Sequence, residues 1–287
     1  MPELPEVETV RRGLAPVLTG ARLARVEARR PDLRFPLPVD FVQRLTGARI
    51  ERLDRRGKYL LAPLDRGTSL LMHLGMTGRF EIEGVAAKRA PGEFALAAPA
   101  DPKHAHVVFE TDAGARVTFF DARRFGYMDL VDEGDLDTHP RLAGLGPEPL
   151  GDAFDAAYLK RVFADRKQSA KTLLLDQRVV AGLGNIYVCE ALHRARISPI
   201  KPAARVRGRQ LVGLVRTVRS VLTEAIASGG STLRDYASAD GALGYFQHSF
   251  QAYGREHEPC LSPGCRGVIR REVQSGRSTF HCPVCQT

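Results

Sequence analysis

The spacing of apolar residues changes once along this chain, and the change divides it into two parts. Residues 3–18 place apolar side chains at helical spacing. The chain then continues in short apolar or alternating runs separated by turn residues, a pattern typical of antiparallel strands joined by hairpins. An Ala-, Gly- and Pro-rich stretch at 85–102 predicts an exposed loop. The runs lie at 48–53, 59–64, 69–74, 79–83, 106–110, 115–120 and 126–131. This pattern predicts a β-rich domain over residues 1–132, a sandwich or a barrel, with a leading helix.

Helical spacing returns after a proline- and glycine-containing stretch at 133–151, which we interpret as an interdomain linker. The longest of the expected helices has one continuous apolar face and ends at Gly229–Gly230. Polar, glycine-containing residues at 231–258 predict a loop. The pattern therefore indicates an α+β chain, with a helical domain over 152–255 and a distinct tail over 256–287. The helices are expected at 154–164, 170–176, 186–194 and 206–227.

Composition narrows the class of protein. A chain of 287 residues with 44% hydrophobic and 26% charged residues can bury the cores of two domains. It contains no apolar run long enough to span a membrane, and the acidic residues near the N-terminus exclude a signal peptide. We therefore expect a cytoplasmic protein without a membrane partner. A net charge of +9 favours a polyanionic partner, although a basic soluble enzyme has the same composition.

Four cysteines in the tail have the spacing of a zinc site. They form two close pairs separated by sixteen residues, Cys260/Cys265 and Cys282/Cys285. Two such pairs on two tight turns match the tetrahedral ligand set of one structural Zn²⁺, and metal binding would supply the folding energy of a segment poor in apolar residues. A pair of disulfides is the alternative. The strands of this β-ribbon are predicted at 267–271 and 277–281. The fifth cysteine, Cys189, falls on a predicted helix and is expected to be a buried thiol.

The N-terminus offers a nucleophile. Removal of Met1 would leave Pro2 with a free secondary amine, and α-amino groups titrate near pH 8, so a useful fraction is unprotonated at neutral pH. Glu3 and Glu6 follow directly and could move protons around the same nitrogen. A retained Met1 would instead make this nitrogen an unreactive amide. The same residues also suit the ordinary start of a helix, where proline and acidic side chains are common.

Several motifs together resemble the formamidopyrimidine-DNA glycosylase family. They are MPELPEVETVRRGL at the start, then RRGKYL, HLGMTGRF, DARRFG, LGPEPL and GLGNIYVCE, followed by the four-cysteine tail, and they occur in the family's order. The resemblance implies a β-sandwich N-terminal domain, a helical domain with a helix–two-turn–helix motif, and a zinc finger. It also implies a base-excision-repair enzyme, a bifunctional glycosylase and AP lyase that removes 8-oxoguanine and formamidopyrimidines from duplex DNA.

The resemblance assigns catalytic roles to five residues. Pro2 would form a Schiff base with the sugar C1′, Glu3 would protonate the ring oxygen, and Glu6 would support it. Lys58, in RRGKYL, would donate a proton and contact a phosphate, although an ordinary surface lysine of a strand fits the same position. Arg277, in the tail, would assist the final elimination and hold DNA. The Schiff base is the electron sink for β- and δ-elimination, which cleave the strand.

The resemblance also assigns a DNA-binding set. Filling the gap left by an extruded nucleotide restores lost stacking, and a methionine, an arginine and a phenylalanine take that role in the family. Core packing is the alternative for the methionine and the phenylalanine. Residues 229–253 resemble the region whose loop closes over the extruded base, and the GLGN turn would approach the DNA closely. The gap-filling residues are Met76, Arg123 and Phe125, and the backbone and phosphate contacts are His104, Arg124, Lys167 and Asn185.

Two alternative functions remain open at this point. The sister family that acts on oxidised pyrimidines, resembling endonuclease VIII, usually starts PEGPE, whereas this chain starts PELPE and has the full gap-filling set. A catalytically silent zinc-finger DNA-binding protein fits the basic charge and the tail, but leaves the Pro2–Glu3 terminus unexplained. We expect a monomer that binds double-stranded DNA carrying an oxidised purine or an abasic site.

Overall fold

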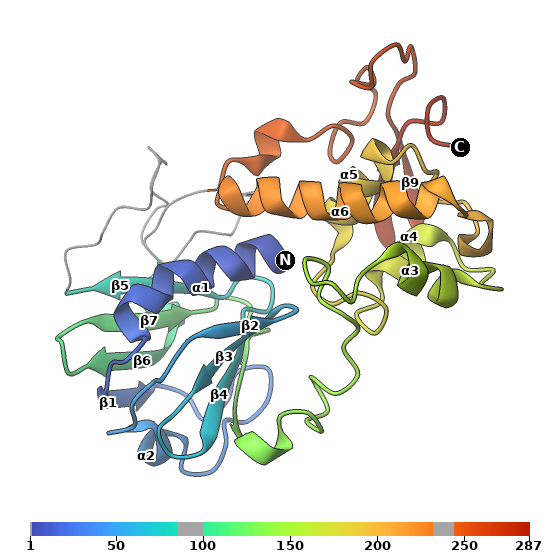
Figure 1. Cartoon of the computed structure of the whole chain (residues 1–287). Helices are drawn as coiled ribbons and strands as arrows, with labels where there is room; N and C mark the ends of the chain where they lie inside the picture. The colour runs from blue at the N-terminus through green and yellow to red at the C-terminus, as the bar shows by residue number, and fades with distance from the viewer. Residues whose placement is uncertain (1, 85–99, 232–243) are drawn as a thin grey trace. The chain divides into compact units, whose positions relative to one another are not determined.

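The computed structural model describes residues 2–84, 100–231 and 244–287 (Figure 1). It contains two compact units, one of residues 1–143 with 226–247 and one of residues 144–225 with 248–287. Residues 85–99 of the first predicted loop and residues 232–243 of the second lie outside the described residues. The described part of the second loop contains one short helix at Phe246–Ser249. The predicted domain boundaries stay predictions.

The first unit begins with helix α1 (Leu4–Leu18). Pro5 occupies the first turn, where its missing N–H costs nothing, and Glu3 is the N-cap residue. The backbone N–H of Glu3 donates to Glu6 Oε2 at 2.8 Å, which satisfies one of the donors that a helix start leaves over. One face of α1 is buried, with Val10 and Leu14 fully inaccessible. The predicted leading helix is therefore present.

Two four-stranded antiparallel sheets form the rest of the first unit (Figure 1). Apolar residues from both sheets and from α1 share one core, so the sandwich alternative is confirmed. Helix α1 packs against β2, β3 and β5. One sheet has the order β1 (Leu23–Ala28), β6 (Ala105–Thr111), β7 (Arg116–Phe120), β5 (Arg79–Glu83), and the other β2 (Asp54–Arg56), β3 (Tyr59–Pro63), β4 (Thr68–His73), β8 (Tyr127–Asp132). Short helices α2 (Phe41–Leu45), η1 (Pro102–His104) and η2 (Glu133–Asp135) complete it.

The prediction of a strand at 48–53 is wrong. This segment makes only isolated bridges, Arg22 with Arg49 and Ile50 with Leu64. Strands β1 and β2 and helix α2 were not predicted. Strand β1 was missed because its register against β6 shifts between Leu23 and Arg25, which interrupts the alternation of apolar and polar residues. Strand β2 was missed because its sequence, Asp-Arg-Arg, contains no apolar residue.

The second unit is helical and ends in a β-ribbon. Its helices are α3 (Ala156–Phe163), α4 (Ala170–Leu175), α5 (Asn185–Arg194) and α6 (Arg209–Ala227), each within three residues of its predicted ends. The short helix η3 (Ala203–Arg205) also lies in this unit, whereas the short helix η4 (Phe246–Ser249) has residues in both units. None of the helices in the described ranges is long and apolar enough to cross a membrane.

The tail forms the two-stranded antiparallel ribbon of β9 (Arg270–Gln274) and β10 (Arg277–His281). The second strand agrees with the prediction, but the first begins at Arg270 rather than at 267. Gly267 instead packs closely against Cys282, since a Cβ at this position would lie 2.5 Å from Cys282 Sγ. Ser275 and Gly276 both have positive φ, which is the geometry of a tight two-residue hairpin turn.

Glu8 joins α1 to the sheet and gives a first testable prediction. Its carboxylate forms ion pairs with Arg11 at 2.9 Å and with Arg55 of β2 at 3.2 Å. Burial by itself raises the pKa of Glu8, but hydrogen bonds from Arg11 and Arg12 and the charge of Arg55 lower it to about 2. A lowered carboxyl pKa stabilises the folded state above pH 4–5, and this contribution disappears as the pH falls towards 2.

Replacing Glu8 with glutamine is therefore expected to lower the free energy of unfolding at pH 7 by about 3 kcal/mol. The difference between the two proteins should shrink steadily between about pH 5 and pH 2, because the wild type loses the same contribution there. Urea unfolding at several pH values measures both. The exposed Glu51→Gln variant is the control, and a Glu8→Gln deficit that does not vary with pH would contradict this account.

Candidate active site and metal centre

The start of α1 concentrates buried acidic groups. Pro2 is buried, and Glu3 and Glu6 are only 3% and 2% exposed. Glu6 uses both carboxylate oxygens: Oε2 accepts the N–H of Glu3, and Oε1 accepts the N–H and the hydroxyl of Ser231 at 2.8 and 3.1 Å. Glu6 therefore connects the N-terminal residues to a segment 225 positions later. The three N-terminal residues proposed from the sequence do lie together.

The segment bonded to Glu6 is closed at its base. The N–H of Tyr245 donates to the carbonyl of Ser228, and the N–H of Phe246 donates to that of Gly230, both at 3.0 Å. Gly230 has φ +81°, and a Cβ there would lie 3.0 Å from Glu6 Oε1. A Cβ at Gly244 would come within 2.3 Å of the Gly230 carbonyl. These glycines let both ends of the expected loop meet beside Glu6; the residues between 231 and 244 lie outside the described ranges.

Lys58 lies in the turn that joins β2 to β3, two strands against which α1 packs. It is 7% exposed, which excludes the surface-lysine alternative. Burial, and then the charge of Lys58, lower the pKa of His73 to about 4, so this imidazole is neutral at physiological pH. Its Nδ1 accepts the N–H of Gly75 at 3.0 Å, and this bond holds the turn that leads to Met76.

The three gap-filling candidates lie on two loops that contact each other. The guanidinium carbon of Arg123 is 4.9 Å from the ring centre of Phe125. Gly75, with φ +64°, lets the first loop approach the second, since a Cβ there would be 2.3 Å from the Phe125 backbone. Phe125 is 39% exposed and Met76 partly buried, so core packing does not explain Phe125.

Asp121 connects these two loops through hydrogen bonds. It is fully buried, and its carboxylate accepts the hydroxyl of Thr77 at 2.5 Å and the N–H of Gly126 at 2.6 Å. The Thr77 hydroxyl in turn accepts the N–H of Arg123 at 3.1 Å. The N–H of Asp121 donates to the carbonyl of His104, so this DNA-contact candidate is beside the same loop. Sequence reasoning passed over Asp121, although it opens the DARRFG motif.

Arg124 follows with an exposed side chain and a positive φ of 55°. Its guanidinium is 3.8 Å from Asp32, a pair exposed enough to contribute little to stability. The Arg124 side chain is therefore exposed to solvent, as is that of Arg123.

The remaining candidates belong to the second unit. Lys167 is exposed ahead of α4, and Asn185 opens α5 directly after the GLG turn. The Asn185 side-chain amide donates to the carbonyl of Ser278 at 2.9 Å, and the fully buried Lys171 donates to the same carbonyl at 3.0 Å. These bonds fix the start of β10, where Arg277 is exposed, next to the start of α5. Asn185 and Arg277, far apart in sequence, are thus brought to one region.

Glu190 and Lys171 are structural residues that sequence reasoning missed. The fully buried Glu190 carboxylate accepts the backbone N–H groups of Gln251, Ala252 and Tyr253 at 2.8–2.9 Å, which ties α5 to the chain entering the tail. Lys171 also donates to Thr279 Oγ1 at 2.6 Å. The available signal was a charged residue inside an apolar helical run, which requires a buried partner.

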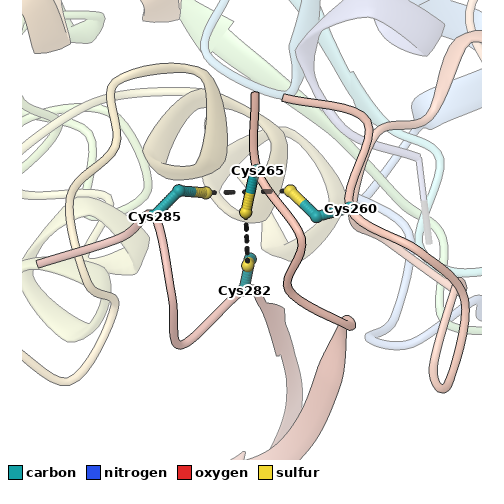
Figure 2. Close-up of side chains that lie close together, drawn as sticks. All are labelled: Cys260, Cys265, Cys282 and Cys285. Carbon is teal, nitrogen blue, oxygen red and sulfur yellow. Dashed lines mark hydrogen bonds between the residues drawn. The ribbon is translucent and has the colours of Figure 1, made fainter. Parts of the chain in front are cut away.

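The four tail cysteines converge (Figure 2). All four Sγ atoms lie within 4.8 Å of one another, with Cys260 3.7 Å from Cys285 and Cys265 3.6 Å from Cys282. Tetrahedral Zn²⁺ with Zn–S bonds of about 2.3 Å places its sulfurs about 3.8 Å apart, so this set fits the ion. Five free thiols exclude the disulfide alternative, and Cys189 is buried away from this cluster, as expected.

Comparison with known proteins agrees with this geometry. Residues 1–128 match the model of the formamidopyrimidine-DNA glycosylase N-terminal domain, and residues 145–237 match that of its H2TH domain. The formamidopyrimidine-DNA glycosylase of Phenylobacterium zucineum is 69% identical over 286 residues, which cover 100% of both chains.

Solved structures give the same result. The MutM (Fpg) protein of Thermus thermophilus is 41% identical, with a TM-score of 0.83 over 99% of this chain and 98% of that one. The Lactococcus lactis Fpg bound to abasic-site DNA is 33% identical, with a TM-score of 0.85 over 99% of both chains. The structure of the same protein bound to N7-benzyl-Fapy-dG DNA is 33% identical, with a TM-score of 0.86 over 100% of both chains. The chain belongs to the formamidopyrimidine-DNA glycosylase family.

Proposed function

We propose that this chain is a bifunctional DNA glycosylase and abasic-site lyase that removes 8-oxoguanine and formamidopyrimidines from duplex DNA. The observation that carries this proposal is the buried cluster of Pro2, Glu3 and Glu6 at the start of α1. A helix start of merely structural function has no need to bury two carboxyl groups beside its terminal residue. The DNA complexes of the Lactococcus lactis relative support the substrate class.

Pro2 is the nucleophile in this proposal. After removal of Met1, its secondary amine attacks C1′ of the damaged nucleotide, and the bond from C1′ to the base nitrogen breaks. The base leaves with that bonding electron pair and takes up a proton. The Pro2 nitrogen then loses its proton, O4′ takes up a proton as the C1′–O4′ bond opens, and an iminium forms between Pro2 and C1′.

Glu3 and Lys58 supply protons to these steps. Glu3, 3% exposed and adjacent to Pro2, protonates O4′ as the sugar ring opens. Glu6 holds the backbone N–H of Glu3 and thereby supports its orientation. Lys58, buried in the turn beside α1, donates a proton near the lesion and contacts a phosphate.

The iminium then drives strand cleavage. It acts as an electron sink that acidifies the C2′ proton, so loss of this proton expels the 3′ phosphate by β-elimination. A second proton loss expels the 5′ phosphate by δ-elimination, and water hydrolyses the imine to regenerate Pro2. Arg277, exposed at the start of β10, assists the final elimination by binding the phosphate.

The tail cysteines hold one structural Zn²⁺ in this proposal. Four thiolates leave no open coordination position for water, so the ion supplies folding energy to the tail. The small core around Ile269 and Cys282 contains few apolar residues, in agreement with this requirement.

The exposed basic and gap-filling residues bind the DNA. The space of the extruded nucleotide is filled by Met76, Arg123 and Phe125. Hydrogen bonds of Asp121 and Thr77 hold the two loops that carry these residues next to each other. Phosphate contacts position the duplex without reading its sequence. These contacts come from His104, Arg124, Lys167 and Asn185.

A gel assay on duplex oligonucleotides tests the proposal. The protein is incubated with duplexes carrying 8-oxoguanine opposite cytosine, 8-oxoguanine opposite adenine, or thymine glycol opposite adenine. We expect base release and strand cleavage mainly on the first. Preference for thymine glycol would favour the oxidised-pyrimidine family, and DNA binding without any cleavage would favour a catalytically silent DNA-binding protein.

Arg123 is expected to determine the preference for cytosine opposite the lesion. Its guanidinium donors match the O2 and N3 acceptors of cytosine better than the edge of adenine, and a good polar pair discriminates by roughly 1–3 kcal/mol. Arg123→Ala should therefore reduce the ratio of excision opposite C to excision opposite A by about ten- to a hundredfold. Borohydride trapping on a single-stranded abasic site should stay normal, because no opposite base is present there. An unchanged ratio would show that another residue selects the opposite base.

A further inference from the structure

We propose that His193 is a positioning residue of the metal centre, which donates its Nε2–H to the Cys260 thiolate and thereby fixes the zinc site to helix α5. This inference rests on the zinc binding proposed above. It concerns a residue outside the tail and outside every motif used to assign the function.

The geometry places the imidazole directly against one ligand sulfur. His193 lies in the last turn of α5 and is fully buried, and its Nε2 is 3.3 Å from Cys260 Sγ. A metal-bound thiolate has no proton and can only accept a hydrogen bond. The nitrogen must therefore be the donor, which sets the imidazole as the tautomer that carries hydrogen on Nε2.

In the described part of the chain, two backbone donors to the sulfurs come from the tail itself. The N–H of Gly267 donates to Cys265 Sγ at 3.3 Å, and the N–H of Ser262 donates to Cys260 Sγ at 3.5 Å. His193 is 67 residues away from its cysteine. The hydrogen bond from His193 therefore ties the metal centre to helix α5.

Among the described residues, helix α5 has two further hydrogen-bonded connections, one to the tail and one to the segment that leads into the tail. At its start, Asn185 donates to the carbonyl of Ser278, and in its middle Glu190 accepts three backbone N–H groups of residues 251–253. His193 at its end makes the third connection. A helix held at three points transmits the position of the metal-bound loop to the turn that carries Asn185 and to the strand that carries Arg277. The donor to Cys260 therefore acts on both metal retention and the DNA-binding surface.

Metal affinity of the full-length protein tests this role. Hydrogen-bonding partners of metal ligands contribute about 10- to 100-fold to metal affinity. Competition with a chelator should therefore show zinc binding weakened about 10- to 100-fold in His193→Phe, which removes the donor. His193→Gln, which keeps an N–H donor, should recover much of the loss. His281→Phe is the matched control, because it removes a buried imidazole that lies in the tail and whose Nε2 is 3.8 Å from Glu272 Oε1 rather than from a cysteine sulfur.

Two readouts separate hydrogen bonding from packing. In the Co²⁺-substituted protein, loss of an N–H···S bond raises the energy of the sulfur electrons, so the thiolate-to-cobalt charge-transfer band of His193→Phe should shift to longer wavelength. The band of His281→Phe should stay in place. In the zinc-loaded wild type, ¹H–¹⁵N NMR should find the His193 hydrogen on Nε2, a result that needs no variant to fold.

The outcomes distinguish this inference from the zinc proposal. A wild type that binds no zinc contradicts the zinc site and with it this role. A wild type that binds zinc while its His193 Nε2 is unprotonated overturns the role of His193 alone. So does a His193→Phe variant with normal zinc affinity, or an equal loss in His193→Phe, His193→Gln and His281→Phe.

Discussion

Replacement of Glu3 with glutamine is expected to slow the excision of 8-oxoguanine by roughly 100- to 10,000-fold, the usual contribution of a general acid. Glutamine keeps the size of the side chain and an acceptor oxygen at the helix start, but it has no proton to give to the opening sugar ring. Glu3 is 3% exposed, so water has little access to replace it. Single-turnover excision on an 8-oxoguanine:cytosine duplex measures the loss.

An abasic-site duplex separates this role from folding or binding. Its sugar already opens without loss of a base, so Glu3→Gln should retain far more cleavage of this substrate than of 8-oxoguanine DNA. Glu8→Gln is the matched control, because it changes a carboxyl of the same helix that is engaged by arginines. Equal losses on both substrates, or a normal excision rate in Glu3→Gln, would contradict the assignment.

Cys282→Ser is expected to release the zinc and to weaken DNA binding strongly. The tail has little apolar core, so loss of one ligand removes the folding energy that positions β10 and Arg277. The β-sandwich should stay folded, because its core contains no residue of the tail. Zinc content, DNA affinity and the circular dichroism of the sheets measure the three effects.

Cys189→Ser gives the control for this prediction. Cys189 is also buried in the second unit, but it does not belong to the four-sulfur cluster. This variant should keep both zinc and DNA affinity. Normal DNA affinity in Cys282→Ser after demonstrated zinc loss would show that the metal centre does not support binding.

Local sequence patterns predicted the elements that bury a regular apolar face. Strands β3, β4 and β7 are short apolar or alternating runs and helix α6 has apolar residues at helical spacing, so their positions could be predicted from the sequence. Strand β2, Asp-Arg-Arg, carries no such signal, because it is held by pairing with β3 and by the ion pair of Arg55 with Glu8. The first ribbon strand was misplaced because the cysteine-containing turn at Gly267, which packs against Cys282, and not apolar alternation, determines where it starts.

The residues of the candidate site likewise separate into those that local sequence motifs predict and those that only tertiary contacts reveal. The four clustered cysteines lie in two short motifs and could be predicted, as could the N-terminal carboxyls. The residues that hold these motifs in place could not, because their partners are remote in sequence. Thr77 bonds Asp121 across 44 positions, Lys171 bonds Thr279 across 108, and Ser231 bonds Glu6 across 225. Only the tertiary structure brings such pairs together.

The most direct test of the account is the identity of the atom that becomes attached to DNA. Borohydride reduces an imine to a stable amine, so treatment of the mature protein during reaction with 8-oxoguanine DNA should trap one covalent complex. Proteolysis and mass spectrometry then locate the attached sugar. The account predicts attachment at the N-terminal peptide, on the nitrogen of Pro2. Attachment at Lys58 or at any other lysine would contradict it.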